Sequence, residues 1–185
     1  MTIDLFTQQA EAVGAECLMV ADRQAALDSV VSALLREGVE DAPGRWAVWA
    51  DPESPEETRT SVLSRVPGVK FDVTREHASQ SLAGVSEVEW GIAETGTLLS
   101  DSSAVDRRLV STLPPLHIAM LPVSRILADM GSALARIDVQ RISFLAAITG
   151  PSRTADIERV LTIGVHGPRR LLIILMQPED GGARA

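Results

Sequence analysis

Short, continuously apolar runs that alternate with amphipathic segments are the feature that most restricts the fold of this chain. The clearest runs are Trp46–Ala50, His117–Leu121 and Leu171–Met176. A strand without a polar side needs both faces of its sheet covered, and parallel strands meet this need because their crossover helices lie on the faces. We therefore expect an α/β protein, a three-layer α/β/α sandwich, with any ligand beyond the carboxyl ends of the strands.

Helical spacing of apolar residues marks the segments between these runs. It is strongest over Arg23–Arg36, where Leu27, Val30, Val31, Leu34 and Leu35 share one face and Gly38 follows as a stop. Ser54-Pro55-Glu56-Glu57 is typical of a helix start, with Ser54 as N-cap, and predicts a helix to about Val66. Two further helices are predicted, a short one over Arg75–Leu82 and a longer one over Val123–Ile137.

The remaining segments complete one domain of 185 residues. Val69–Val73 and Ile142–Ile148 are predicted strands, and Val85–Ser100 is predicted to form two strands around a glycine-containing turn. Residues 1–18 are either a weak helix or an arm. Residues 178–185 are expected to form a mobile tail.

Charge is distributed unevenly and excludes some partners. The formal net charge is −8, and residues 1–60 carry 12 acids against four arginines. Nucleic-acid binding requires a basic face, and no such face is visible. No apolar stretch is long enough to cross a bilayer, and Met1-Thr2-Ile3-Asp4 does not resemble a secretion signal, so we expect a cytoplasmic protein without membrane insertion.

Thiolate-based cofactors are not expected. Cys17 is the single cysteine of the chain, whereas structural zinc sites and iron–sulfur clusters need about four ligands. No two histidines share a helix turn with an acid, so we expect no metal site and no cofactor.

The loop Ala93-Glu94-Thr95-Gly96-Thr97 is the first candidate site. Its glycine lets the backbone approach a ligand, and burial of Glu94 would raise the pKa of that carboxyl and suit it to act as a base or nucleophile. A tight hairpin in which Glu94 bonds a backbone donor or an arginine explains the same residues.

The second candidate follows the predicted strand Ile142–Ile148 and runs from Thr149 to Asp156. If a helix begins there, its free N–H groups together with Thr149, Gly150, Ser152, Arg153 and Thr154 would hold a small anion. The alternative is that Ser152 or Thr154 is simply the N-cap of that helix. Spacing alone does not decide between an anion-binding site and an ordinary N-cap.

A third loop, Gly164-Val165-His166-Gly167-Pro168, places a histidine between glycines. His166 would bind substrate or move a proton, or be an ordinary hydrogen-bonded loop residue. Because loops at the carboxyl ends of parallel strands converge, we expect Glu94 and Ser152 to lie on that side of the sheet and to share one pocket.

Together and in order, these three loops resemble the LUD domain family, in its lactate-utilization protein C group. The resemblance is carried by Glu89-Trp90-Gly91-Ile92-Ala93-Glu94-Thr95-Gly96-Thr97, by Thr149–Glu158 and by Gly164–Pro168, and it spans roughly Val85–Met176. It implies that residues 1–185 form a single LUD domain with the fold of sugar-phosphate isomerases, glucosamine-phosphate deaminases, coenzyme A transferases and 5-formyltetrahydrofolate cyclo-ligase.

The resemblance also implies a role in oxidising L-lactate to pyruvate beside two partner proteins, one with cysteine motifs and one with iron–sulfur clusters. We therefore expect an accessory component that binds a small anionic ligand or partner subunits. Coenzyme A transferases use a glutamate in a comparable turn, so an enzyme acting on a phosphorylated or thioester small molecule through Glu94 is the alternative. Thr95 replaces the asparagine of that turn.

Overall fold

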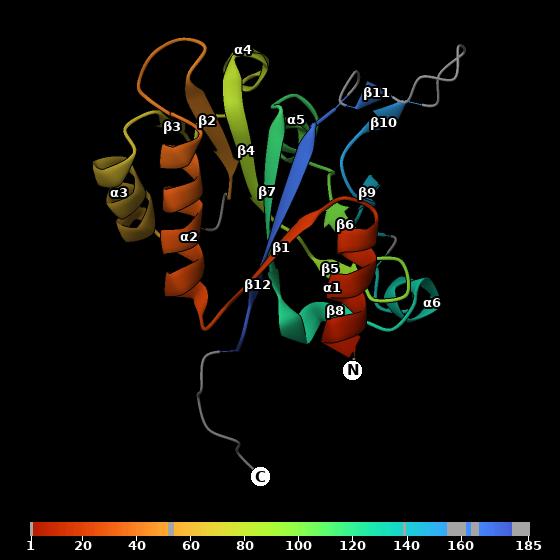
Figure 1. The fold of residues 1–185 in the computed structure, drawn as a ribbon. Coiled ribbons are helices and arrows are strands. Elements are labelled where there is room, and N and C mark those ends of the chain that lie inside the picture. Colours follow the sequence, from red (N-terminus) through yellow and green to blue (C-terminus); the bar gives the residue numbers. More distant parts are fainter. Residues whose placement is uncertain (1, 52–53, 139, 155–161, 164–166, 179–185) are drawn as a thin grey trace.

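A computed structural model describes residues 2–51, 54–138, 140–154, 162–163 and 167–178. The expected position of His166, the residues from Ala155 to Glu158, and residues 179–185 of the predicted tail lie outside these ranges. Figure 1 shows a parallel sheet with helices on both of its faces, which confirms the predicted α/β/α arrangement.

The main sheet has six parallel strands in the order β1-β12-β7-β4-β2-β3. The predicted apolar runs supply its centre, and the expected strand Trp46–Ala50 is confirmed without change. The strands are β1 (Glu16–Val20), β2 (Trp46–Ala50), β3 (Val69–Lys70), β4 (Ser81–Glu87), β7 (Leu116–Pro122) and β12 (Arg170–Met176).

Two groups of helices cover this sheet. One face packs against α2 and α3 in a core built around Val30, Leu34, Trp49 and Ile118. The other packs against α1, α4 and α5, with Phe6 of α1 fully buried. The helices are α1 (Thr2–Ala12), α2 (Arg23–Arg36), α3 (Glu56–Arg65), α4 (Arg75–Ser79), α5 (Val105–Thr112) and α6 (Met130–Leu134), and none that the structure describes is long and apolar enough to span a membrane.

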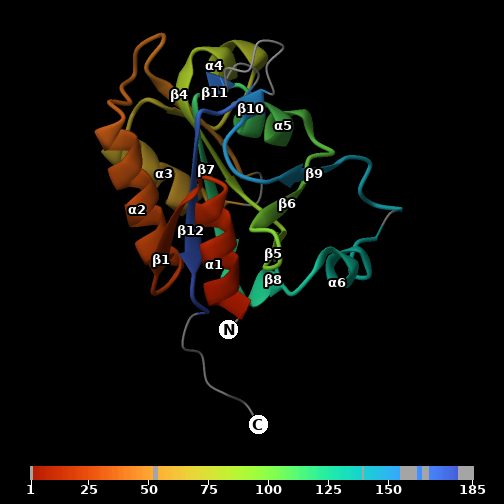
Figure 2. The same ribbon diagram turned by 45° about the vertical axis from the view of Figure 1, so that its right-hand side comes forward.

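A second sheet, which the sequence did not predict, packs beside α1 (Figure 2). It has the order β8-β5-β6-β9, with strands β5 (Trp90–Ile92), β6 (Thr97–Asp101), β8 (Ile126–Leu127) and β9 (Leu145–Ile148). The hairpin of β5 and β6 forms the predicted turn around Gly96, whose φ is +63°, but Val85–Glu87, the start of the predicted pair, belongs to β4 of the main sheet. A separate two-stranded ladder joins β10 (Arg153–Thr154) to β11 (Thr162–Ile163).

Several predicted boundaries were wrong, for identifiable reasons. The predicted helix over Val123–Ile137 is instead a 3₁₀ turn (Val123–Arg125), then β8, then α6. Ile126 and Leu127 pair with β5, and the Asp129 carboxylate accepts a hydrogen bond from the Ser132 N–H, which starts a new helix. Ile126 and Leu127 fit the apolar spacing of a helix, but their pairing with β5 decides the structure of this segment.

The remaining differences are smaller. Pro55, not Ser54, occupies the capping position of α3, which has no side-chain cap, and the Ser54 N–H donates to Asp51 O in a turn. The predicted strand Val69–Val73 is only Val69–Lys70, the predicted helix from Arg75 ends at Ser79, and the strand predicted from Ile142 begins at Leu145. Residues 2–18 include α1 and most of β1, which decides between helix and arm.

Candidate functional site

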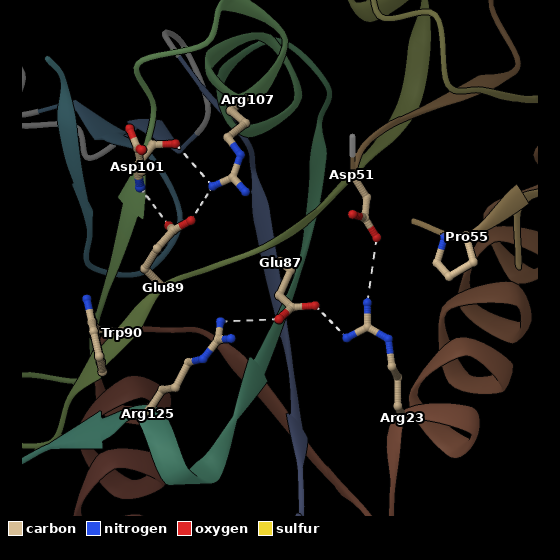
Figure 3. A pocket seen from close by; sticks show the side chains of 9 residues that line it. All are labelled: Arg23, Asp51, Pro55, Glu87, Glu89, Trp90, Asp101, Arg107 and Arg125. Atoms are coloured by element: carbon tan, nitrogen blue, oxygen red, sulfur yellow. Dashed lines mark hydrogen bonds and ion pairs between the residues drawn. The ribbon is translucent and has the colours of Figure 1, made fainter. Parts of the chain in front are cut away.

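The connections of the main sheet diverge between β2 and β4. From β2 the chain passes through α3 to β3 on one side, whereas from β4 it passes through the second sheet and α5 to β7 on the other. In open parallel sheets, ligands bind beyond the carboxyl ends of the strands at such a point. A cleft of about 720 Å³ lies there (Figure 3), lined by Arg23, Asp51, Pro55, Glu87, Glu89, Trp90, Asp101, Arg107 and Arg125.

Glu87, at the end of β4, is the central carboxylate of this cleft. One of its oxygens accepts a hydrogen bond from Arg23 Nη1 at 2.7 Å, and the other accepts one from Arg125 Nη1 at 3.2 Å. Arg23 is the first residue of α2, and its Nη2 also lies 3.7 Å from the carboxylate of Asp51, which follows β2. Two guanidinium groups from different elements therefore converge on one carboxylate.

A second ion pair forms the opposite wall. Arg107 of α5 donates to the carboxylate of Glu89 and to the backbone oxygen of Asp101, and Glu89 Oε2 accepts from the Asp101 N–H at 2.6 Å. Burial lowers the pKa of Arg107, but the hydrogen bond and the charge of Glu89 outweigh burial and raise that pKa. Arg107 therefore remains cationic, and Glu89 is held in place as its partner.

The exposed fractions divide the cleft into a fixed base and an accessible rim. The side chains of Asp51 and Glu87 are 11% and 19% exposed, whereas those of Arg23 and Arg125 are 42% and 44% exposed. With three arginines and four carboxylates, the lining offers both cationic donors and anionic acceptors. It therefore suits a small polar molecule that carries both a carboxylate and a hydroxyl or amine.

The cleft does not present a preformed metal centre. Within the described ranges, no group of three or more His, Cys, Asp and Glu side chains is arranged to hold a metal ion.

None of the residues predicted from the sequence lines this cleft. Glu94 is exposed at the tip of the β5–β6 hairpin, where its backbone N–H donates to Ala128 O at 3.0 Å. Glu94 therefore does not lie in the apolar surroundings that the sequence predicted for it.

The structure does bring part of the first two loops together. Thr95 Oγ1 lies 2.7 Å from Thr97 Oγ1, which lies 2.8 Å from Thr149 Oγ1, so three hydroxyls form a chain across β6 and β9. Thr97 is buried, while Thr95 and Thr149 are exposed.

Both loops pack on the carboxyl end of α1. A side-chain carbon at Gly96 would lie 2.2 Å from Ala10 N, and one at Gly150, whose φ is +76°, would lie 2.6 Å from Val13 O. Arg153 Nη2 donates to the same Val13 oxygen at 2.5 Å. These contacts give Gly96, Gly150 and Arg153 a structural role, because they hold the carboxyl end of α1 against the two loops.

The expected location of Ser152 was wrong. The Ser152 backbone N–H donates to Pro168 O, and Ser152 also lies beside Gly167. Pro168 precedes β12, and Pro115, which accepts hydrogen bonds from Arg169 and Arg170, precedes β7. Ser152 therefore lies at the amino ends of the main strands. Arg153 and Thr154 belong to β10 rather than to a helix start. The strand before Ser152 is β9 of the second sheet, so the carboxyl-edge argument does not apply to it.

The cleft residues carry a sequence signal of their own. Asp51 directly follows an apolar run, and Arg23, Glu87 and Arg125 each stand at or just after a strand end. Charged residues at the carboxyl ends of predicted parallel strands are the pattern that locates such a site.

Comparison with known proteins places this geometry in context. Residues 3–176 match the family described as the LUD domain. The chain is 41% identical over 106 residues to lactate utilization protein C of Bacillus subtilis, covering 54% of this chain and 44% of that protein. It is 32% identical over 140 residues to lactate utilization protein C of Halalkalibacterium halodurans, covering 70% and 61%.

An uncharacterized protein of Neisseria meningitidis, NMB1437, is 38% identical over 102 residues, covering 52% of this chain and 43% of that protein. The chain thus spans about half the length of the curated relatives it matches. Among solved structures, a DUF162 family protein from Deinococcus radiodurans superposes with a TM-score of 0.64 at 18% identity, covering 96% of both chains. That likeness supports the fold.

Proposed function

Because the chain belongs to the LUD domain family, we propose that it acts in lactate utilization, as an accessory component of a cytoplasmic system that oxidises L-lactate to pyruvate. The names of its relatives support this role. Oxidation of lactate to pyruvate releases two electrons and two protons, which an acceptor must take up. Cys17 is the single cysteine of the chain, whereas an iron–sulfur cluster needs about four ligands. In keeping with the resemblance to the lactate-utilization protein C group, we propose that the acceptor of electrons is a partner protein that carries iron–sulfur clusters.

The cleft at the carboxyl edge is the proposed ligand site. The observation that carries this proposal is the placement of Glu87 between Arg23 and Arg125 where β2 and β4 diverge. Each guanidinium has five N–H donors, and Glu87 takes one from each, so both groups keep donors for a ligand carboxylate while Glu87 orients them.

A 2-hydroxycarboxylate matches this lining better than a simple anion. Its carboxylate would accept hydrogen bonds from Arg23 and Arg125, and its hydroxyl would donate to Asp51 or Glu87. A simple anion meets the arginines equally well, but it brings no donor of its own to the carboxylates of the cleft and is repelled by them.

Isothermal titration calorimetry with L-lactate, pyruvate and propionate tests the site. We expect L-lactate to bind more tightly than propionate, which lacks the hydroxyl. Arg125→Met should weaken L-lactate binding by roughly tenfold or more, because a charge-assisted hydrogen bond contributes about 1.5–3 kcal/mol. Unchanged affinity in Arg125→Met would refute the site.

Glu94→Gln is the matched control, because Glu94 is exposed and lies outside the cleft lining. If the alternative role of Glu94 as base or nucleophile of an enzyme is right, Glu94→Gln rather than Arg125→Met abolishes turnover of a phosphorylated or thioester substrate. The two variants therefore separate the accessory role from the enzymatic alternative.

A further inference from the structure

The two edges of the main sheet differ in their protection. At one edge, β3 has two residues, follows Pro67, and carries Lys70, whose Nζ donates to Asp41 Oδ1 at 2.6 Å. At the other, β1 has five residues, Glu-Cys-Leu-Met-Val, with neither lysine nor proline. Short length, charged side chains and proline keep an edge strand from pairing with another chain, and β1 carries one charged residue, Glu16, at its first position, where it pairs with Arg170.

Strand β1 is also exposed. Among the strands described, it pairs with β12 alone, and Figure 2 shows it between α2 and α1. The side chains of Leu18 and Met19 are 41% and 42% exposed. Because successive side chains alternate, Leu18 points to one side of the sheet and Cys17 and Met19 to the other, so an added strand would meet apolar surface on both sides.

A groove of about 430 Å³ runs along the Cys17 and Met19 side of this edge. Its walls are Ile3 and Thr7 of α1 and Leu175 of β12, and its rim carries Asp4, Gln8 and Glu11. Burial, and then the charge of Glu11, raise the pKa of Cys17 to about 11, so the thiol stays neutral and lines the groove as a small apolar group.

From this edge and groove together, we propose that β1 is a docking strand for a partner protein, which adds an extended segment bearing apolar and basic residues as a seventh strand of the sheet. Main-chain hydrogen bonds along β1 would supply affinity. Alternate side chains of the segment would fill the groove and place a basic group near Glu11.

Charge selects this occupant over a second copy of the chain. The acidic excess of the whole molecule lies in residues 1–60, which include α1 and β1. Pairing of β1 with β1 of another copy would bring two acidic rims together, and like charges facing each other across an interface are repulsive. A basic segment turns the same rim into an attractive contact, independently of what the ligand cleft binds.

The test uses two synthetic nonapeptides, one alternating valine with arginine and one alternating valine with glutamate. Fluorescence anisotropy measures their affinities for the full chain, and hydrogen exchange locates the amides that become protected. We expect the arginine peptide to bind at least tenfold more tightly than the glutamate peptide, to protect amides of β1, and to bind less tightly as salt is raised.

Two variants locate the contact. Met19→Lys places a charge on the edge at a side chain that is already partly exposed, and it should weaken arginine-peptide binding roughly tenfold. Glu11→Gln should weaken that binding by about twofold to fivefold. Glu57→Gln, which removes one exposed acid from α3, is the matched control and should leave the binding unchanged.

Three results would overturn the proposal. They are equal affinity for both peptides, protection confined to elements other than β1, and a dimer in analytical ultracentrifugation that Met19→Lys abolishes. The last would assign the edge to a second copy of this chain. None of these measurements depends on lactate, so failure here leaves the proposed ligand site unaffected.

Discussion

His117 shows how one residue couples the core to pH. It lies in β7 with its side chain 1% exposed, its Nε2 is 2.9 Å from Ser86 Oγ, and its Nδ1 has no hydrogen-bond partner among the described residues. Burial lowers the pKa of His117 to about 4. The folded protein therefore holds a neutral imidazole that becomes charged more easily when the chain unfolds.

This difference predicts a loss of stability in acid. In the unfolded chain the pKa of the imidazole returns to its ordinary value of about 6.5, so the unfolded state binds a proton first as pH falls. We expect the free energy of unfolding to decrease by about 3 kcal/mol between pH 6.5 and pH 4 through this group, in addition to changes from other groups. Urea titrations at several pH values measure this decrease in the free energy of unfolding.

The control for this prediction is another histidine. His77→Gln retains His117 and should show the same acid loss as the wild type, whereas His117→Gln should show a smaller one. An identical dependence on pH in all three proteins would mean that His117 does not contribute.

At the scale of single residues, the sequence identified chemical types better than positions. The motif around Glu94 is present as a tight turn, but its glycines serve contacts with α1 and its carboxylate is exposed. Arg23 and Glu87 are ordinary surface residues in the sequence. They become a site only because β1, β4 and α2 bring them within 2.7 Å of each other.

At the scale of elements, the local apolar pattern predicted the structure correctly where an element packs through a single apolar face. Helix α2 has the predicted bounds, and the Asp22 carboxylate caps it by accepting from the Ala25 N–H at 2.7 Å. The helix predicted over Val123–Ile137 was wrong, because apolar residues spaced three or four apart carry no information about the pairing of Ile126 and Leu127 with β5.

The packing of the β5–β6 hairpin on α1 predicts the effect of a single methyl group. Gly96→Ala places a side chain in the left-handed region and drives it into the backbone of Ala10, so we expect a loss of about 3 kcal/mol or more in the free energy of unfolding. Urea denaturation followed by circular dichroism provides the value.

Gly44→Ala is the matched control for that substitution. Gly44 has a φ of +82° but no atom within 4 Å of the added carbon, so only the backbone cost of about 1–2 kcal/mol applies. If Gly96→Ala costs no more than Gly44→Ala, the close approach of the hairpin to α1 is not a source of stability.

At the scale of the whole molecule, the described residues form a six-stranded sheet, a four-stranded sheet and the β10–β11 ladder, and the proposed accessory role leaves the redox chemistry to a partner protein. With Cys17 as its single thiol, this chain should bind no iron–sulfur cluster after reconstitution with ferrous iron and sulfide, and by itself it should reduce no dye in the presence of L-lactate. Iron analysis and absorbance spectra, with an apo-ferredoxin reconstituted in parallel, measure this. Stoichiometric iron with cluster absorbance would contradict the accessory role.

Sequence by itself determined the fold class, α2, the central strands β2, β7 and β12, and the β5–β6 turn. Each of these depends on interactions between near neighbours or on apolar runs that require burial on both sides. Tertiary structure alone decided the second sheet, the break between β8 and α6, the position of Ser152 at the amino edge, and which of the charged residues near strand ends meet around Glu87. These depend on which distant segments become neighbours, and strand order and the point where connections diverge have no local signature in the chain.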